Sequence, residues 1–173
     1  SLGKVTEYVS IFRDISGAKQ TEAEIHQLAF YDPLTKLPNR RLLYERALFS
    51  LLSSERKKTY CALLFLDMDK FKILNYTMGH LYGDLMLVEV ANRIKSCIRN
   101  VDSVARIGGD EFVILLDDLS RNLKEASQKA ASIAEKVRAA LAQPYQLQEV
   151  KHQSSPSMGV CLYLGQETTI EDL

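Results

Sequence analysis

Apolar residues along the chain form short continuous or alternating runs that are typical of β-strands. The run Tyr60–Leu66 is apolar throughout, which fits a central strand buried on both faces. The pattern predicts five strands in all, at Cys61–Leu66, Val104–Ile107, Phe112–Leu116, Tyr145–Gln148 and Ser157–Leu164.

Between these runs, apolar residues recur every three or four positions, as on one face of a helix. The spacing predicts helices at Arg40–Ser53, Gly83–Ile98 and Leu123–Leu141. The residues expected to face the core are Leu43, Ala47, Leu48 and Leu51 in the first helix, and Leu87, Val90, Ala91, Ile94 and Ile98 in the second. A further helix is expected at Ser16–Phe30, with Ile25, Leu28 and Ala29 on one face, either for a coiled-coil dimer or for packing on the domain.

The mixed order of helices and strands, interrupted by a hairpin, argues for an α+β fold with a sheet of about five strands. The chain has 173 residues, of which 46% are hydrophobic, and this is enough for one globular domain.

Composition excludes several classes of partner. The formal net charge is zero, so we expect no binding of nucleic acid polymers or of acidic membranes. No apolar run approaches the roughly 20 residues that span a bilayer, so we expect a cytoplasmic segment without membrane contact, although the full-length protein can be tethered elsewhere. The three cysteines, Cys61, Cys97 and Cys161, are widely spaced among apolar residues and are expected to be free thiols in a reducing compartment.

The candidate chemistry begins at a glycine-rich turn. Gly108 and Gly109 lie between two β-type runs, so they predict a tight hairpin turn. Because glycine has no side chain, a ligand can lie directly on the backbone there. Asp110 and Glu111 follow at once and place carboxylate oxygens at the edge of the turn.

A second cluster of polar residues follows the central strand. Asp67 ends the run Tyr60–Leu66, and Lys72 comes five residues later. If the hairpin pairs beside this strand, Asp110 comes alongside Asp67. Their oxygens suit a hard divalent cation, and Lys72 can meet phosphate charge.

These motifs, in this order, resemble the GGDEF family of diguanylate cyclases from about Tyr31 to the end of the chain. The matching stretches are Asp32-Pro-Leu-Thr-Lys-Leu-Pro-Asn-Arg40, Phe65-Leu-Asp-Met-Asp-Lys-Phe-Lys72, Gly79-His-Leu-Tyr-Gly-Asp84, Gly108-Gly-Asp-Glu-Phe112 and Ser157-Met-Gly159. The resemblance implies a ferredoxin-like cyclase palm that condenses two GTP molecules, one on each of two facing domains of a homodimer, into cyclic di-GMP.

The resemblance also implies the metal ligands and the base. Asp67, Asp110 and the Met68 carbonyl are expected to bind one or two Mg²⁺ ions, or Mn²⁺ in their place. Either Asp110 or Glu111 is expected to accept the proton of the attacking 3′-hydroxyl, and the family favours Asp110.

Further positions match the GTP-binding residues of the family. Lys72 and the backbone N–H groups of Lys70 and Phe71 are expected to contact the triphosphate. Asn75 and Asp84 are expected to read guanine, with Asp84 as the cap of a helix starting at Leu85 as the alternative or additional role. The chain departs from the family at the next position, where Tyr76 stands in place of the usual aspartate.

Two arginines have expected partners. Arg99 and Asp102 match the Arg-x-x-Asp product-inhibition motif of the family, in which both residues hold guanine of cyclic di-GMP. The alternative is an i, i+3 ion pair at a helix end. Arg106 is expected to pair with Asp32, or else to form only a surface ion pair.

The resemblance divides the chain into residues 1–30, expected to be the end of a PAS-like domain with a linker helix, and residues 31–173, the GGDEF domain. Thr168–Leu173 looks like the start of the C-terminal helix, so we expect truncation there and weak or no activity of this chain alone. The alternative function is a catalytically silent module that binds GTP or cyclic di-GMP ahead of an EAL phosphodiesterase domain.

Overall fold

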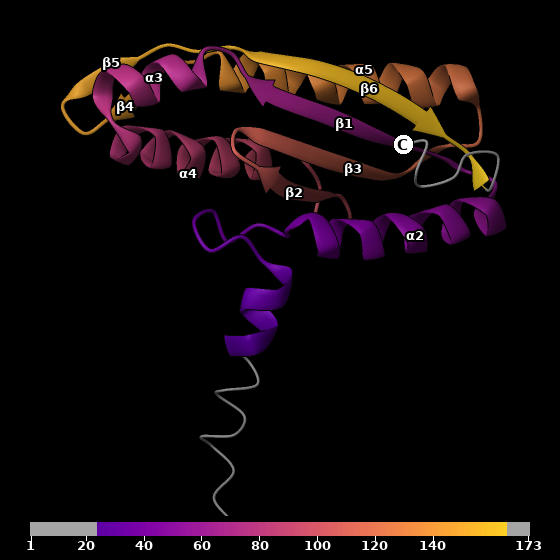
Figure 1. Cartoon of the computed structure of the whole chain (residues 1–173). Coiled ribbons are helices and arrows are strands. Elements are labelled where there is room, and N and C mark those ends of the chain that lie inside the picture. Colours follow the sequence, from indigo (N-terminus) through magenta and orange to yellow (C-terminus); the bar gives the residue numbers. More distant parts are fainter. Residues whose placement is uncertain (1–23, 166–173) are drawn as a thin grey trace, which may run out of the picture.

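The computed structural model describes residues 24–165. The PAS-like segment, most of the expected helix Ser16–Phe30 and the expected helix start at 168 therefore lie outside the described residues. Residues 24–30 are helical, and a turn-rich segment leads from them into the first long helix (Figure 1).

The described elements follow one another in a mixed order. They are α2 (Arg40–Lys57), β1 (Tyr60–Met68), α3 (Phe71–Met78), α4 (His80–Cys97), β2 (Ser103–Gly108), β3 (Glu111–Ser120), α5 (Leu123–Leu141), β4 (Tyr145–Leu147), β5 (Val150–His152) and β6 (Pro156–Tyr163). The α+β expectation is confirmed.

The main sheet has four antiparallel strands in the order β2-β3-β1-β6 (Figure 1). The strand expected at Tyr145–Gln148 forms as β4, but it lies outside this sheet and pairs with β5 in a separate two-stranded hairpin. Strand β1 is thus bonded on both sides, to β3 and to β6, as its continuous apolar run predicts.

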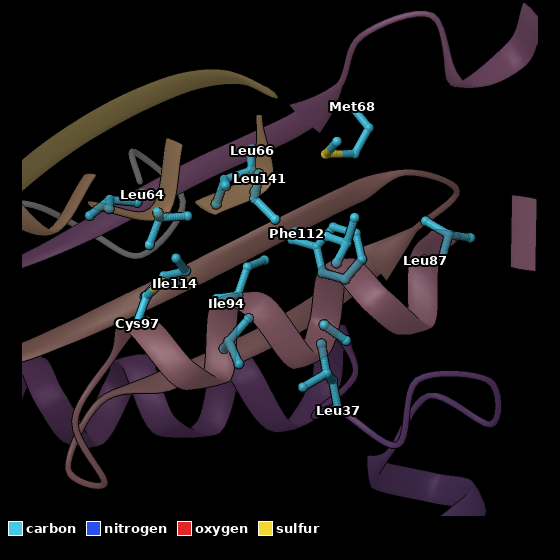
Figure 2. Close-up of a cluster of buried hydrophobic side chains, with 14 of the residues drawn as sticks. Leu37, Leu64, Leu66, Met68, Leu87, Ile94, Cys97, Phe112, Ile114 and Leu141 are labelled. Carbon is cyan, nitrogen blue, oxygen red and sulfur yellow. The ribbon is translucent and has the colours of Figure 1, made fainter. Parts of the chain in front are cut away.

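Alternate residues of β1 point to the two faces of the sheet. Leu64, Leu66 and Met68 enter the larger core, where they meet α4 and α5 (Figure 2). Leu63 belongs to a smaller core under α2. Farther along this second face, Phe65 is 41% exposed, so the cover of α2 ends before the strand does.

Helix α2 turns a partly polar face to the sheet, which corrects one sequence prediction. Leu48 is 42% exposed, whereas Ser50 is buried. The Ser50 hydroxyl donates to the Asp117 carboxylate and is 2.7 Å from the Tyr163 hydroxyl. Because these partners satisfy the serine inside the protein, the buried stripe is rotated away from Leu48.

The segment after β1, for which no helix was predicted, forms α3 from Phe71 to Met78. One further prediction needs correction. Helix α4 begins at His80 with Gly79 as its N-cap, so Asp84 lies inside the helix and is not its cap. The helix starts earlier because Gly79 takes a left-handed φ of 89° and allows a sharp turn between α3 and α4.

The predicted glycine hairpin is confirmed, with its turn one residue farther along the chain. Gly108 ends β2, and Gly109 and Asp110 form the turn before β3. Gly109 has a φ of 52°, in the left-handed region that glycine tolerates. The carboxylate of Asp110 is thereby placed in the turn itself.

The loop before α2 is fastened to this hairpin, as expected from the Arg106–Asp32 pairing. Arg106 Nη1 donates to both carboxylate oxygens of Asp32 at 3.1 Å, and its Nε and Nη2 donate to the Gly109 carbonyl. Asp32 also accepts hydrogen bonds from the backbone and hydroxyl of Thr35. The pair is mostly buried, so it is more than a surface ion pair.

The three cysteines are free thiols, as expected. Cys61 and Cys97 are buried free thiols, and Cys161 is a partly buried one. Within residues 24–165, no helix is both long enough and apolar enough to cross a membrane.

Candidate active site

Acidic side chains gather where β1 ends beside the hairpin turn. Asp67 is the register partner of Glu111 across the β1–β3 ladder, so the two carboxylates lie on the same face of the sheet. Asp110 precedes Glu111 in the turn. Like charges directly opposite one another are unfavourable in a sheet, which makes this edge a place for a cation.

The pKa of Asp67 also indicates that negative charge at this edge is not balanced by positive charge. Burial raises the pKa of this carboxyl, and the neighbouring carboxylates of Asp110 and Asp69 raise it further. Lys72 acts in the opposite direction but does not outweigh them. The structure therefore brings Asp67, Asp110 and Lys72 into one electrostatic site, as the sequence predicted.

The residues present fit a magnesium ion by their chemistry. Within the described part of the chain, no three His, Cys, Asp or Glu side chains are arranged to hold a metal by themselves. Mg²⁺ is usually bound through one or two carboxylates together with substrate phosphates. Two carboxylates that repel each other, next to the backbone carbonyl of Met68, match that requirement.

The amino end of α3 faces the same region. Lys70 is the N-cap, has a left-handed φ of 61° and makes no side-chain capping hydrogen bond. The first N–H groups of a helix have no intrahelical partner, and they carry partial positive charge. The N–H groups of Phe71 and Lys72 are therefore available for anionic oxygens near Asp67.

Asp69 is turned to a different partner. Its carboxylate accepts hydrogen bonds from the hydroxyls of Ser155 and Ser157, and these bonds lower the pKa of Asp69. No role was predicted for Asp69 or for Ser155. Ser157 was predicted only as the start of a strand, and only the fold brings Ser155 and Ser157 to Asp69.

Asn75 and Asp84 lie on the adjacent helices α3 and α4. Asn75 Oδ1 is buried and is the one buried side-chain polar atom of residues 24–165 without a hydrogen-bond partner. Gly83 packs directly against it: a Cβ at Gly83 would lie 2.0 Å from Oδ1. Asp84, the next residue, is exposed. A buried polar atom without a partner is costly, which is consistent with a role in binding.

An open pocket of about 420 Å³ lies on the part of the sheet that α2 leaves uncovered. It brings Asp67 and Glu111 together with Ser157 and with Arg40 from the start of α2. The guanine-reading candidates and Lys72 do not line it. The predicted residues thus occupy two neighbouring regions, the uncovered sheet face and the α3–α4 corner, which meet at the end of β1.

Arg99 and Asp102 lie at the opposite end of the hairpin. The six residues of β2 separate them from the glycine turn, a rise of about 20 Å. They form the i, i+3 ion pair: Arg99 donates from Nε and Nη2 to the two carboxylate oxygens at 3.0 and 2.7 Å. The Asp102 side chain is fully buried and that of Arg99 is 51% exposed.

Asp102 is fully engaged within the protein in this arrangement. It also accepts from the backbone N–H groups of Arg99 and Asp117. The half-exposed guanidinium of Arg99 borders two pockets of about 290 and 250 Å³. Of the two residues, Arg99 is the one open to a ligand, and Asp102 holds it in place.

Comparison with protein families matches residues 29–173 to the family described as "Diguanylate cyclase, GGDEF domain". MucR of Pseudomonas aeruginosa, a bifunctional diguanylate cyclase/cyclic di-GMP phosphodiesterase, is 43% identical over 150 residues. The match covers 87% of this chain but only 21% of MucR, so the chain spans about a fifth of the length of that relative.

Solved structures show the same fold. The GGDEF domain of TpbB (YfiN) from Pseudomonas aeruginosa is 36% identical, with a TM-score of 0.72 over 77% of this chain and 75% of that one. The GGDEF domain of DgcB from Caulobacter crescentus, solved in complex with c-di-GMP, is 27% identical, with a TM-score of 0.69 over 81% of each chain.

Proposed function

Because the chain belongs to the GGDEF family of diguanylate cyclases, we propose that it is a diguanylate cyclase domain that condenses two GTP molecules into cyclic di-GMP. The observation that carries the proposal is the carboxylate cluster of Asp67, Asp110 and Glu111 at the end of the central strand, beside Lys72. This is an oxygen-rich, electron-rich edge next to the free N–H groups of a helix, which suits a metal-bound triphosphate.

In this proposal Asp67, Asp110 and the Met68 carbonyl hold Mg²⁺. The bound ion supplies positive charge that offsets the charge of the reacting phosphate and lowers the pKa of the attacking hydroxyl. Lys72 and the N–H groups of Lys70 and Phe71 bind the triphosphate. Gly108 and Gly109 let the nucleotide approach the backbone of the turn.

The reaction proposed is an in-line displacement. The 3′-oxygen of one GTP forms a bond to the α-phosphorus of the other, and the bond from that phosphorus to the leaving pyrophosphate breaks. Asp110 accepts the hydroxyl proton, with Glu111 beside it. Each domain holds one GTP, so the reaction needs two facing copies, and a second round of attack closes the ring.

Guanine selection is assigned to Asn75 and Asp84. The unpaired Oδ1 of Asn75 supports this role, because the amide is held in place without an internal partner. Adenine has an amino group where guanine has O6, so the amide and the carboxylate would be mispaired with ATP.

The test is incubation of the protein with GTP and Mg²⁺, followed by nucleotide analysis, together with calorimetric titration of GTP. Wild type is expected to bind GTP with Mg²⁺ and to lose most of this affinity in EDTA or in Asp110→Ala. Asp118→Asn is the matched control, since Asp118 is an exposed aspartate that pairs with Lys57. Equal GTP affinity in EDTA would contradict the metal role.

The same experiment addresses the alternative of a silent regulatory module. GTP that is bound tightly in the presence of Mg²⁺ but never converted, even at high domain concentration, would favour that alternative. The retained Asp110 and Glu111 favour the enzyme.

We also propose that cyclic di-GMP binds at Arg99 and inhibits the enzyme. Nε and Nη2 of Arg99 already donate to Asp102 and to the Asp117 carbonyl, so Nη1 is the nitrogen that can donate to guanine O6 or N7. Arg99→Ala is expected to abolish product binding while GTP binding persists. Competition of product and GTP for one site would count against this assignment.

A further inference from the structure

Asp69 attaches the end of β1 to a segment far away in the sequence. Its Oδ2 accepts from the Ser155 hydroxyl at 2.5 Å, and its Oδ1 accepts from the Ser157 hydroxyl at 2.7 Å. Its backbone N–H donates to the Ser155 carbonyl at 2.9 Å, and its carbonyl accepts from the Ser154 hydroxyl at 2.9 Å. Both carboxylate oxygens and both backbone polar groups of Asp69 are thus bound to the single segment Ser154–Ser157.

The residue that follows needs such support. Lys70 has a φ of 61°, a left-handed conformation that is unfavourable for a residue with a Cβ atom. Conformations of this kind persist where the surroundings hold them, and they often accompany functional sites. No side-chain cap stabilises the start of α3. The hydrogen bonds of Asp69 to Ser154, Ser155 and Ser157 fix the residue immediately before this strained turn.

The groups on either side of Asp69 are those assigned to metal and phosphate. The Met68 carbonyl is one residue before it, and the N–H groups of Lys70 and Phe71 are one and two residues after it. Fixing Asp69 therefore fixes the direction of all three. Both oxygens of the Asp69 carboxylate accept hydrogen bonds from serine hydroxyls, so they are not directed to a metal site shared with Asp67 and Asp110.

We infer that Asp69 is a positioning residue: through Ser155 and Ser157 it holds the loop that binds metal and phosphate, and it is not itself a metal ligand. The inference rests on the proposed GTP site. The competing role, a third carboxylate ligand, makes the opposite prediction for two variants.

Asp69→Asn separates the roles, because an amide can accept from one serine hydroxyl and donate to the other, yet it is a poor metal ligand. Ser155→Ala combined with Ser157→Ala does the reverse: it removes the attachment of the carboxylate and leaves the charge. Asp69→Ala removes both. Ser96→Ala is the control, because the hydroxyl of this exposed serine bonds only within its own helix among the hydrogen bonds of residues 24–165.

Calorimetric titration of GTP with Mg²⁺ is expected to show about tenfold weaker binding for Asp69→Ala and for the double serine variant, since small displacements of positioned groups are costly. The GTP affinity of Asp69→Asn and of Ser96→Ala is expected to stay within about threefold of wild type, a change smaller than the loss of one typical hydrogen bond. The inference would be overturned in favour of a metal ligand by two results together. Asp69→Asn would bind GTP as weakly as Asp69→Ala, and the double serine variant would bind it as tightly as wild type.

A second measurement needs no nucleotide. Hydrogen exchange is expected to accelerate in Asp69→Ala and in the double serine variant, but not in Asp69→Asn, at the amides bonded around this turn. These are Asp69, which donates to the Ser155 carbonyl, and Ile73 and Leu74, which donate to the Lys70 carbonyl. Unchanged exchange in every variant would refute the positioning role. A wild type that shows the slow exchange but binds no GTP would instead refute the proposed function and leave the attachment intact.

Discussion

Gly83→Ala should weaken guanine binding without unfolding the protein. The new Cβ would lie 2.0 Å from Asn75 Oδ1, 3.0 Å from Asn75 Cγ and 3.1 Å from Phe71 Cζ. The first distance is impossible between non-bonded atoms, so the Asn75 amide must move. The nucleotide site would lose its proposed base-reading group although no residue that contacts the base is replaced.

The expected size of the effect on stability has two parts. Alanine in place of glycine inside a helix gains about 0.5–1 kcal/mol. Overpacking a tight contact costs about 1–3 kcal/mol. The net change in the free energy of unfolding is therefore between about zero and 2.5 kcal/mol of destabilisation. In an Asn75→Ala background the severe clash is absent, so Gly83→Ala should be close to neutral or stabilising there.

The two variants should thus be coupled by about 0.5–3 kcal/mol in urea denaturation, which is the range for residues in direct contact. Loss of one hydrogen bond to guanine corresponds to about 0.5–1.5 kcal/mol, or roughly 3–10-fold in GTP affinity. Wild type, Gly83→Ala, Asn75→Ala and the double variant form the cycle. Urea denaturation of these four proteins measures the coupling in stability, and calorimetric titration measures their affinity for GTP. Additive stabilities, or a Gly83→Ala variant with wild-type preference for GTP over ATP, would refute the reasoning.

The remaining predictions concern ion pairs. Arg106→Ala should lower the free energy of unfolding by about 2 kcal/mol, because the guanidinium binds both Asp32 and the hairpin turn. Burial acts to raise the pKa of Asp32, but the hydrogen bonds from Thr35 and Arg106 outweigh it and hold the pKa below its ordinary value. The contribution of Asp32 to stability is therefore present above the pKa of an unfolded aspartate and is lost as the pH falls through the lower folded pKa. Thermal melts at decreasing pH should show a smaller loss in Arg106→Ala. Asp110→Asn, in contrast, should stabilise the nucleotide-free protein by about 0.5 kcal/mol at pH 7, because it relieves repulsion with Asp67; an unchanged or lower melting temperature would contradict this.

Much of the fold was predictable because the apolar pattern directly reports which faces are buried. Helix α5 has the expected bounds, Leu123–Leu141, and the continuous apolar run of β1 correctly indicated a central strand. The expected pairing of Arg106 with Asp32 was also found, since the motifs fixed both positions. The helix and the strand depend on local pattern, whereas the Arg106–Asp32 pair spans 74 positions and was predicted because both residues lie in or beside recognisable motifs.

The errors arose where polar residues are satisfied by distant partners. Ser50 was not among the residues expected to face the core, but it is buried, and its partner Asp117 lies 67 positions away in the sequence. Asp69 and Ser155 are separated by 86 positions. Periodicity carries no information about such pairs, because a serine with a buried partner and a solvated serine look the same in the sequence.

The alternation that builds the sheet also places the candidate site. Leu64, Leu66 and Met68 of β1 enter the larger core, so Asp67, between the last two, must face the other side. A slip of one residue would bury Asp67 and expose these apolar side chains, so the core itself enforces the position of the carboxylate. The acidic edge costs little stability because it begins near Phe65, where the cover of α2 has already ended and water reaches the sheet. Fold and site are therefore specified by the same residues: the apolar half of β1 fixes the register, and the register fixes the direction of the candidate metal ligand.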